Sequence, residues 1–270
     1  MGSGHARSRR QVSVAPPGDA GIVAAATGGL DEAGSLIPLR DDNPAASRPI
    51  VTVALLAAVA LLFLRQYSLG PEAGQLAIYS LGLIPSVLFG LHELPAELAV
   101  VPPVTTVLTS MFLHGGWMHL LGNMLYLWIF GDNVEDAMGH SRFLAFYLLC
   151  GTAAALAQAL PDPHSTIPMI GASGAISGIL GAYLLLFPRA KILAVIPIGF
   201  FLYTVRWPAS IVLIGWFIVQ FLSNALASGG GGVAFRAHLG GFVAGMVLLP
   251  LFKKHDVPIH NPLRGVGRER

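Results

Sequence analysis

Four polar residues stand out because they lie in long apolar stretches, where polar side chains are costly and are therefore candidates for a functional role. They provide one hydroxyl, one amide and two imidazoles: Ser173, Asn123, His119 and His238. Hydrolysis by a serine needs a nucleophilic hydroxyl, a base within about 3 Å of it and donors directed at the developing oxyanion. The four residues supply all of these groups.

In this interpretation, Ser173 attacks a carbonyl carbon, and His238 accepts the serine proton and later donates it to the leaving amine. Asn123 and His119, together with a backbone N–H near Ser173, stabilise the negative oxygen of the tetrahedral intermediate. No carboxylate lies near the start of the apolar stretches that contain Ser173 and His238. We therefore predict a Ser-His dyad that works without an Asp.

Each of these residues also has a purely structural explanation. Ser173 belongs to a run of small residues from Gly171 to Gly178, and small residues at four-residue spacing are common where membrane helices meet. His238 and Asn123 would each serve as hydrogen-bonding groups between helices. The catalytic interpretation is favoured because the candidates agree in depth once the chain is placed in a membrane.

The composition indicates a membrane protein. Of the 270 residues, 54% are hydrophobic and 11% are charged, whereas an average soluble domain has about 25% charged residues. The single cysteine, Cys150, excludes an intrachain disulfide. The net charge is only +2, and we predict a lipid bilayer, but no nucleic acid, as a partner.

A helix that crosses a bilayer core about 30 Å thick needs about 20 mostly apolar residues. Six stretches meet this requirement and predict an all-α integral membrane protein: 49–66, 117–135, 142–160, 170–187, 208–227 and 233–252. Two further stretches are ambiguous. The stretch 74–91 is broken by Gly82 and Pro85, while 192–205 is short and contains Pro197, which suits an interfacial or re-entrant segment.

The distribution of basic residues orients the chain. With six spans and both termini in the cytoplasm, nearly all Lys and Arg residues fall in cytoplasmic segments, as the positive-inside rule requires. The other side keeps only Arg65 and Arg236, and the long segment 66–116 contains no Lys or Arg. A span at 74–91 would invert the rest of the topology. We therefore predict six spans, with a long outer loop between the first two.

In this topology the second, fourth and sixth spans all begin at the outer face. His119 and Asn123 enter near the start of the second span, Ser173 near the start of the fourth and His238 near the start of the sixth. At a rise of about 1.5 Å per residue, all four lie within about 10 Å of the outer boundary. Three helices thus bring the candidate groups to one layer.

The two ends of the chain differ from the apolar part. Residues 1–48 mix Arg, Pro, Gly and Asp without sustained apolar periodicity, which predicts a disordered cytoplasmic tail. Residues 49–252 form the predicted six-helix domain, and residues 253–270 form a basic cytoplasmic tail.

The sequence does not favour metal or cofactor chemistry. His92 and Glu93 are not followed by the second histidine of an HExxH zinc motif. His114 and His119 are spaced for a metal pair but lack neighbouring Asp, Glu or Cys ligands. We predict no cofactor and no metal.

Glycines accompany both proposed reacting residues at four-residue spacing: Gly174 and Gly178 follow Ser173, and Gly241 and Gly245 follow His238. Packed helices normally keep their axes about 8–10 Å apart, which a serine and a histidine cannot easily bridge. Glycine at a helix contact permits a closer approach. We expect the two glycine faces to pack together and to set the distance between nucleophile and base.

Three motifs resemble those of the rhomboid family of intramembrane serine proteases. They are His114-Gly115-Gly116-Trp117-Met118-His119-Leu120-Leu121-Gly122-Asn123, Gly171-Ala172-Ser173-Gly174 and Ala237-His238-Leu239-Gly240-Gly241, within a match over roughly residues 50–252. The resemblance implies a six-helix rhomboid fold around a water-accessible cavity, a dyad of Ser173 and His238, and oxyanion support from His119 and Asn123. It also implies substrates that are single-span membrane proteins.

Two positions depart from the family pattern. Many members have a tyrosine four residues after the serine, where it supports the histidine ring, but here that position is Ser177. The Trp-Arg pair that the family carries in its first long loop is also missing, because that loop has no Arg. The first departure leaves open how His238 is oriented.

The residues and the resemblance together predict a serine endopeptidase that cleaves single-span membrane proteins in or near the outer part of the bilayer. We expect a multi-pass protein of a bacterial inner membrane. The alternatives are a non-enzymatic protein of the same fold that binds membrane proteins or assists their quality control and, less favoured, a transporter. Replacing Ser173 by alanine separates these functions, because only a protease would lose its activity.

Overall fold

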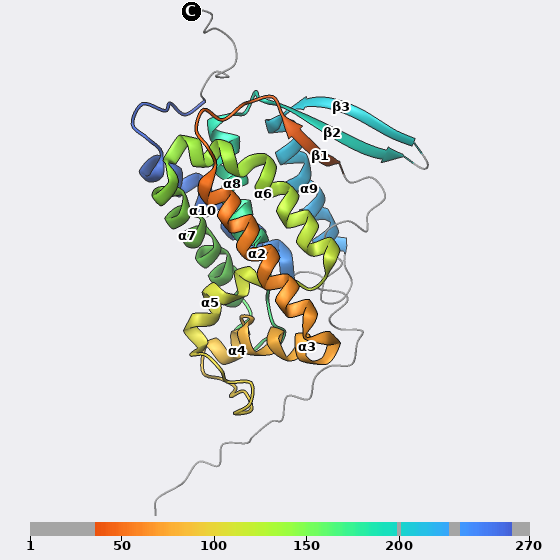
Figure 1. Cartoon of the computed structure of the whole chain (residues 1–270), viewed down its shortest axis with the longest axis vertical. Helices are drawn as coiled ribbons and strands as arrows, with labels where there is room; N and C mark the ends of the chain where they lie inside the picture. Colours follow the sequence, from red (N-terminus) through yellow and green to blue (C-terminus); the bar gives the residue numbers. More distant parts are fainter. Residues whose placement is uncertain (1–35, 199–200, 227–232, 261–270) are drawn as a thin grey trace, which may run out of the picture.

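The computed structural model describes residues 36–198, 201–226 and 233–260. This part of the chain is mostly helical, with a small β-sheet at one end of the helical body (Figure 1). The elements follow one another as β1 (Ile37–Asp41), α2 (Ile50–Ser68), α3 (Gly70–Leu81), α4 (Pro85–Leu88), η1 (Pro103–Thr105), α5 (Thr106–Thr109), η2 (Ser110–Phe112), α6 (Trp117–Met138), α7 (His140–Ala159), α8 (Ser173–Leu186), β2 (Lys191–Ile198), β3 (Phe201–Pro208), α9 (Ala209–Leu226) and α10 (Val233–Phe252).

Each of the six apolar stretches contains a helix whose ends lie within three residues of the predicted ends. Among the described residues, three helices are long and apolar enough to cross a membrane: Ile50–Ser68, His140–Ala159 and Phe235–Phe252. The apolar parts of α8 and α9 are shorter, and the last turns of α6 carry Asp132, Glu135 and Asp136. The helices and the composition together identify a membrane protein.

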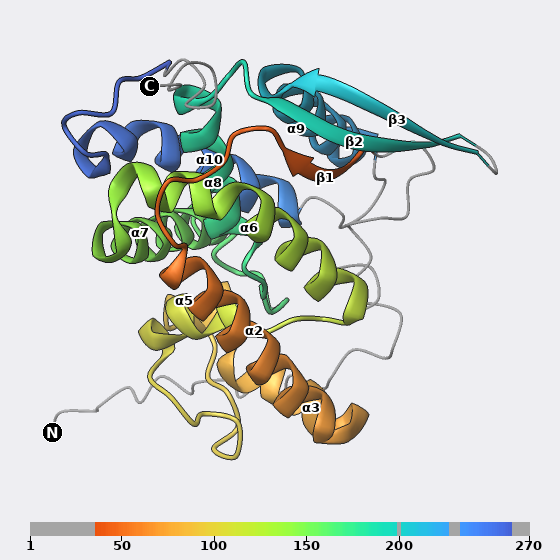
Figure 2. The same cartoon turned by 45° about the horizontal axis from the view of Figure 1, so that its top comes forward.

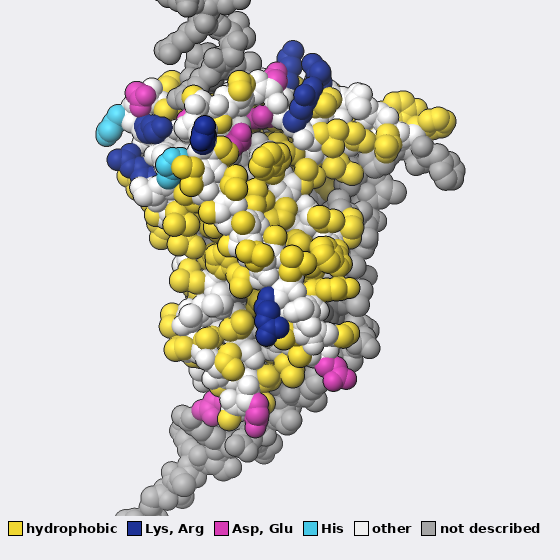
Figure 3. Space-filling view, in the orientation of Figure 1, with side chains coloured by type: hydrophobic (Ala, Val, Ile, Leu, Met, Phe, Trp, Pro, Cys, Tyr) yellow, Lys and Arg dark blue, Asp and Glu magenta, His cyan; other side chains and the backbone are white. Residues whose placement is uncertain are grey.

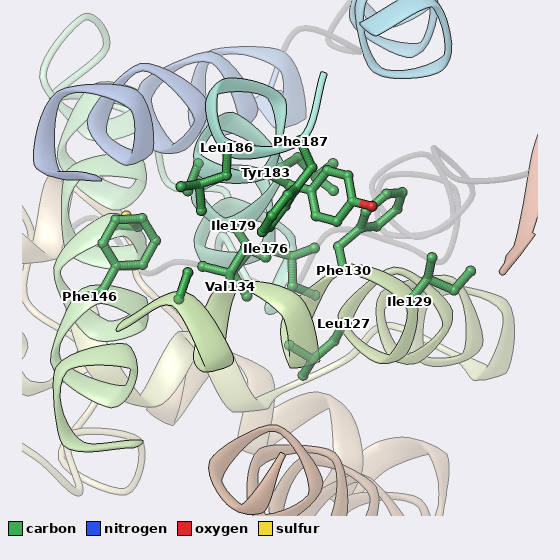
Figure 4. Packing of buried hydrophobic residues seen from close by; sticks show 14 of the residues in the cluster. Leu127, Ile129, Phe130, Val134, Phe146, Ile176, Ile179, Tyr183, Leu186 and Phe187 are labelled. Atoms are coloured by element: carbon green, nitrogen blue, oxygen red, sulfur yellow. The ribbon is translucent and has the colours of Figure 1, made fainter. Parts of the chain in front are cut away.

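α8 lies at the centre of the helical body. It packs against α6, α7 and α10, and α7 and α10 also pack against each other. Figure 4 shows Ile176 and Ile179 of α8 in one buried cluster with Val134 of α6, and Tyr183 meets Phe130 edge to face at a ring-centroid distance of 4.9 Å. Because lipid tails are as apolar as these side chains, such helices associate through close packing. This packing fixes the helix that begins at the candidate nucleophile.

The prediction of an all-α protein is wrong in one respect, because the chain contains a three-stranded antiparallel sheet in the order β1-β2-β3. β2 and β3 form a hairpin that projects from the helical body (Figures 1 and 2), where the sequence predicted an interfacial or re-entrant segment at 192–205. Ile192 and Ala194 are fully buried, whereas Lys191 is exposed. This alternation is typical of a strand that is covered on one face.

The sequence predicts a disordered tail before α2, but the chain is part of the fold from residue 36 onward. β1 pairs with β2, although the two strands are far apart in the sequence. Glu135 of α6 accepts hydrogen bonds from the backbone N–H groups of Val51 and Thr52 at 2.8 and 2.7 Å, which satisfies free donors in the first turn of α2. The rest of the predicted tail, residues 1–35, lies outside the described residues.

The predicted C-terminal tail begins in contact with α6. The backbone N–H of Lys254 donates a hydrogen bond to the carbonyl oxygen of Ala137 at 2.9 Å, and its ammonium group donates one to that of Asp136 at 2.8 Å. Residues 261–270 lie outside the described residues.

The ambiguous stretch 74–91 does not form one continuous helix. α3 ends at Leu81, the chain is extended at Gly82, and the short α4 begins at Pro85. Leu83 and Met169 exchange two backbone hydrogen bonds, at 3.0 and 2.8 Å. This pairing ties the segment between α2 and α6 to the residues that lead into α8.

The surface is divided by side-chain type along the long axis of the molecule. On the face shown in Figure 3, apolar side chains cover the middle, most Lys and Arg side chains gather at the end that carries the sheet, and acidic side chains lie at both ends. The apolar band matches the helical part of the fold in Figure 1.

Candidate active site

Ser173 is the first residue of α8, and the chain turns sharply just before it. Gly171 has a φ of +118°, a conformation that residues with a side chain rarely adopt, and its N–H donates a hydrogen bond to the Ser110 carbonyl oxygen at 2.8 Å. Ser173 is partly exposed, whereas the residues that follow it, from Gly174 to Tyr183, are buried. The turn therefore holds a serine at the accessible start of an otherwise buried helix.

His119 and Asn123 lie one helical turn apart near the start of α6 and both approach Gly171. A Cβ atom on Gly171 would lie 2.7 Å from Nε2 of His119 and 3.8 Å from Nδ2 of Asn123. Only glycine leaves room for the imidazole here. The structure thus brings two of the predicted site residues to the turn that precedes Ser173.

The side chains of His119 and Asn123 each have an N–H donor on the side of Gly171. The N–H of Gly115 donates to Nδ1 of His119 at 3.4 Å, so that in a neutral ring the hydrogen is on Nε2, the atom nearest Gly171. Nδ2 of Asn123 is buried, and among the described residues nothing accepts its hydrogen bond. Buried donors are almost always paired. The unpaired amide is a donor available to a group that enters the site.

Two glycine pairs bring the backbones of α8 and α10 into direct contact. A side chain on Gly241 would collide with the carbonyl oxygen of Gly174, and a side chain on Gly245 would collide with that of Gly178. At the same crossing, a Cβ atom on Gly174 would lie 3.9 Å from the carbonyl oxygen of Ala237. The helix segments that carry Ser173 and His238 therefore meet at closer range than larger residues would allow.

His238 is buried on α10 and is contacted by two side chains of α9. Its Nδ1 lies 3.2 Å from Oε1 of Gln220, and its ring centroid lies 5.7 Å from that of Trp216 at an interplanar angle of 40°. The structure therefore places His119 and Asn123 beside the turn before Ser173, and it brings the helix segment of His238 against the start of α8.

Ser177, at the position where the family pattern has a tyrosine, makes a local contact. Its hydroxyl donates a hydrogen bond to the carbonyl oxygen of Ser173 at 2.8 Å, which is the usual back-bonding of a serine within a helix. Ser177 is thereby engaged with its own helix, and the contacts to His238 come from α9.

His114 and His119, the two histidines whose spacing suits a metal pair, lie side by side. The His114 and His119 rings meet at a centroid distance of 4.9 Å, but over the described ranges no three His, Cys, Asp or Glu side chains gather in a way that could hold a metal ion.

Two residues of this region, Trp216 and Gln220, were not singled out from the sequence, and Gly171 was named only as part of a motif. Gln220 is a polar residue inside the predicted span 208–227, and such residues are functional candidates by default. Trp216 lies four residues before it, on the same helix face. This spacing was the available signal, whereas the positive φ of Gly171 has no local signature beyond the glycine itself.

Comparison with known protein families identifies the family of the chain. A family model described as the Rhomboid domain matches residues 102–255. The chain belongs to the rhomboid family, which comprises intramembrane serine proteases and proteins named only as rhomboid-like.

Several curated relatives are similar to this chain over part of their length. "Rhomboid protein 1, mitochondrial" from Saccharomyces cerevisiae is 30% identical over 191 residues, which cover 63% of this chain and 51% of the relative. "RHOMBOID-like protein 5" from Arabidopsis thaliana is 30% identical over 142 residues, covering 53% and 42%. "Rhomboid protease GluP" from Bacillus subtilis is 45% identical over 78 residues, covering 29% and 15%. The chain thus spans about half, or less, of the length of these relatives.

Proposed function

We propose that this protein is an intramembrane serine endopeptidase that cleaves single-span membrane proteins in or near the outer part of the bilayer. Ser173 is the nucleophile, and His238 is the general base and then the general acid. The observation that carries the proposal is the glycine contact between α8 and α10, because it brings the helix segments of the two reacting residues together. Proximity of this kind is what general base catalysis requires.

The oxyanion is stabilised by donors from α6. Nε2 of His119 and Nδ2 of Asn123 both lie beside Gly171, two residues before the nucleophile. The amide of Asn123 is already desolvated and unpaired, so that it loses no existing hydrogen bond when the charge develops. Preorganised donors in a site of low polarity are the most effective form of transition-state stabilisation.

The length of α8 supports a reaction below the membrane surface. Its 14 residues extend over only about 21 Å, whereas the bilayer core is about 30 Å thick. If the end of α8 at Leu186 lies at the cytoplasmic boundary, Ser173 lies well below the outer boundary. A substrate helix would then have to present its peptide bond in a recess that water can enter.

The topology that we propose has six spans and both termini in the cytoplasm, with the sheet on the cytoplasmic side. The gathering of Lys and Arg side chains at the sheet end supports this orientation under the positive-inside rule. The protease unit then consists of the predicted domain 49–252, extended by β1 and by the start of the C-terminal segment. We propose a bacterial inner membrane as the location.

The proposal is tested with the full chain in liposomes and a model single-span substrate. The wild-type protein is expected to cut the substrate at one site near the outer boundary, and Ser173→Ala is expected to bind it without cutting. Cleavage by Ser173→Ala at the wild-type rate would overturn the serine mechanism. Binding by the wild-type protein without any cleavage would favour a non-enzymatic function.

A further inference from the structure

The side chains that surround His238 are unequal on the two faces of α10. On the α8 side, the backbone of Gly174 and Gly178 lies against Gly241 and Gly245 of α10, and the Ser177 hydroxyl is engaged with the carbonyl oxygen of Ser173. On the α9 side, a polar group reaches the imidazole directly, with Oε1 of Gln220 at 3.2 Å from Nδ1. A buried imidazole needs a partner to fix its tautomer and its orientation.

We infer that Gln220 is a positioning residue for His238 and that its carbonyl oxygen fixes the tautomer that the dyad needs. The inference rests on the proposed function, because it concerns the base of that reaction. A carbonyl oxygen can only accept a hydrogen bond, so the contact requires the hydrogen of the neutral ring to be on Nδ1. The lone pair of Nε2 is then free to accept the serine proton.

Trp216 completes the α9 side of this arrangement. Its indole lies against the imidazole and also contacts the ring of Tyr126 on α6 at a centroid distance of 6.0 Å. Trp216 and Gln220 are four residues apart and therefore share one face of α9. One side chain limits the tilt of the imidazole ring, while the other fixes its rotation through a hydrogen bond.

The chemistry explains why a neutral amide suffices. When His238 accepts the serine proton it becomes a cation, and the Nδ1–H bond to Gln220 then strengthens because a hydrogen bond with a charged donor is stronger than a neutral one. A carboxylate at this position would form a stronger hydrogen bond with the cation. It would also add a second buried charge, which is costly without a partner. Gln220 thus takes the orienting role that an Asp has in a Ser-His-Asp triad.

The first test compares two substitutions at Gln220 in the full chain. Gln220→Met keeps the length of the side chain but removes its strong acceptor, and it is expected to lower kcat by about 10²-fold with little change in KM, the size of effect that a misplaced catalytic group produces. Gln220→Glu restores an acceptor and is expected to keep most of the activity. Val219→Met, at a neighbouring residue of α9 whose side chain is 41% exposed, is the matched control and is expected to resemble the wild type.

The second test reads the tautomer without relying on turnover. Nitrogen NMR of histidine-labelled wild-type protein, with His238→Ala used to identify the signal, is expected to show the hydrogen on Nδ1. A ring with its hydrogen on Nε2 would overturn the inference even if Gln220→Met did not fold. If wild-type cleavage depends on Ser173 and Gln220→Met cleaves normally, only this inference fails. If the wild type does not cleave at all, the proposed function fails.

Discussion

α8 and α9 contact the same helix, α10, in different ways. α8 meets α10 backbone to backbone, through glycines that leave no side chain between the helices. α9 meets the histidine of α10 through two long side chains, Trp216 and Gln220. The first contact has almost no freedom, whereas long side chains can adjust. For the proposed dyad, we infer that α8 sets the distance between Ser173 and His238, and that α9 sets the orientation of His238.

The two helices are also held in the fold differently. α8 is buried over most of its length by α6, α7 and α10, whereas many apolar residues of α9, such as Ile211, Ile214 and Phe221, are exposed to the surroundings. α9 follows directly on β3, and the N–H of Ala209 at its start donates a hydrogen bond to the carbonyl oxygen of Ala190 at 2.7 Å. The sheet therefore contributes to the attachment of α9.

The largest effect is expected when the dyad itself is removed. Ser173→Ala and His238→Ala should each reduce cleavage to background, and the double variant should be no slower than either, because residues that act as one unit have non-additive effects. Cleavage rates of the three variants under single-turnover conditions check this. Independent, additive losses would show that the two residues do not act together and would remove the basis of the comparison.

A glycine exchange on α10 tests the rigid contact between α8 and α10. Gly241→Val places a side chain against the Gly174 carbonyl oxygen and is expected to remove most of the activity, since a displacement of about 1 Å can cost about 10²-fold in rate. Gly215→Val on α9 is the matched control, because a Cβ atom there meets nothing within 4 Å.

Both glycine variants are compared with the wild type by cleavage rate in detergent, after circular dichroism shows equal helix content. Near-normal cleavage by a well-folded Gly241→Val protein would mean that the α8–α10 contact does not position the dyad.

Asn123 lies on α6, not on α8 or α9. Its substitution tests stabilisation of the oxyanion separately from the positioning of the dyad. Asn123→Ala removes one oxyanion donor and is expected to lower kcat by about 10²–10³-fold with little change in KM. The amide has no partner among the described residues, so the free energy of unfolding should change little. A parallel loss of activity and thermal stability would instead identify Asn123 as a structural hydrogen-bonding group between helices.

The smallest effect on cleavage is expected from a substitution in the sheet, at Asp41 of β1. Asp41 in β1 accepts hydrogen bonds from Asn133 of α6 at 3.0 Å and from Tyr183 of α8 at 2.5 Å. Burial raises the pKa of Asp41 to about 6. The hydrogen bond from Tyr183 lowers this pKa, and the neighbouring Asp132 carboxylate raises it further. In the unfolded chain an Asp has a pKa of about 3.9.

Because the folded state binds this proton more tightly, the contribution of Asp41 to stability falls as the pH rises from about 4 to about 6 and stays constant above that. The change in the thermal unfolding midpoint between about pH 5 and about pH 7 in detergent should therefore differ between the two proteins, with the wild type losing more stability, or gaining less, than Asp41→Asn as the pH rises. The same difference in both proteins would contradict the burial of this carboxyl group. Cleavage should change less than in Gly241→Val.

The sequence predicted the parts of the fold that have a local signal. The apolar stretches correspond to helices with ends within three residues, and membership of the rhomboid family is confirmed by the family match. The sheet was missed because 192–205 is apolar and short, and its strand character shows only in the alternation of buried Ile192 and Ala194 with Lys191. β1 was missed because its partner strand lies some 150 residues later in the chain.

The candidate site also has a part that the sequence predicted and a part that it did not. Depth in a membrane span was enough to select His119, Asn123, Ser173 and His238, but not to show how the imidazole of His238 is held. Gln220 approaches that ring from another helix, 18 residues earlier in the chain, and a single amide in an apolar stretch gives no sign of its partner. Side-chain orientation depends on helix rotation, which hydrophobic patterning of a membrane helix does not fix.

The central claim is that Ser173 is a nucleophile activated by His238. A fluorophosphonate probe reports this without a protein substrate, because it reacts covalently with an activated serine. Mass spectrometry of the labelled full chain is expected to locate the probe on Ser173 in the wild type and to find it largely absent in His238→Ala. Equal labelling of Ser173 in both proteins, or no labelling of Ser173 in a folded wild-type protein, would contradict the account.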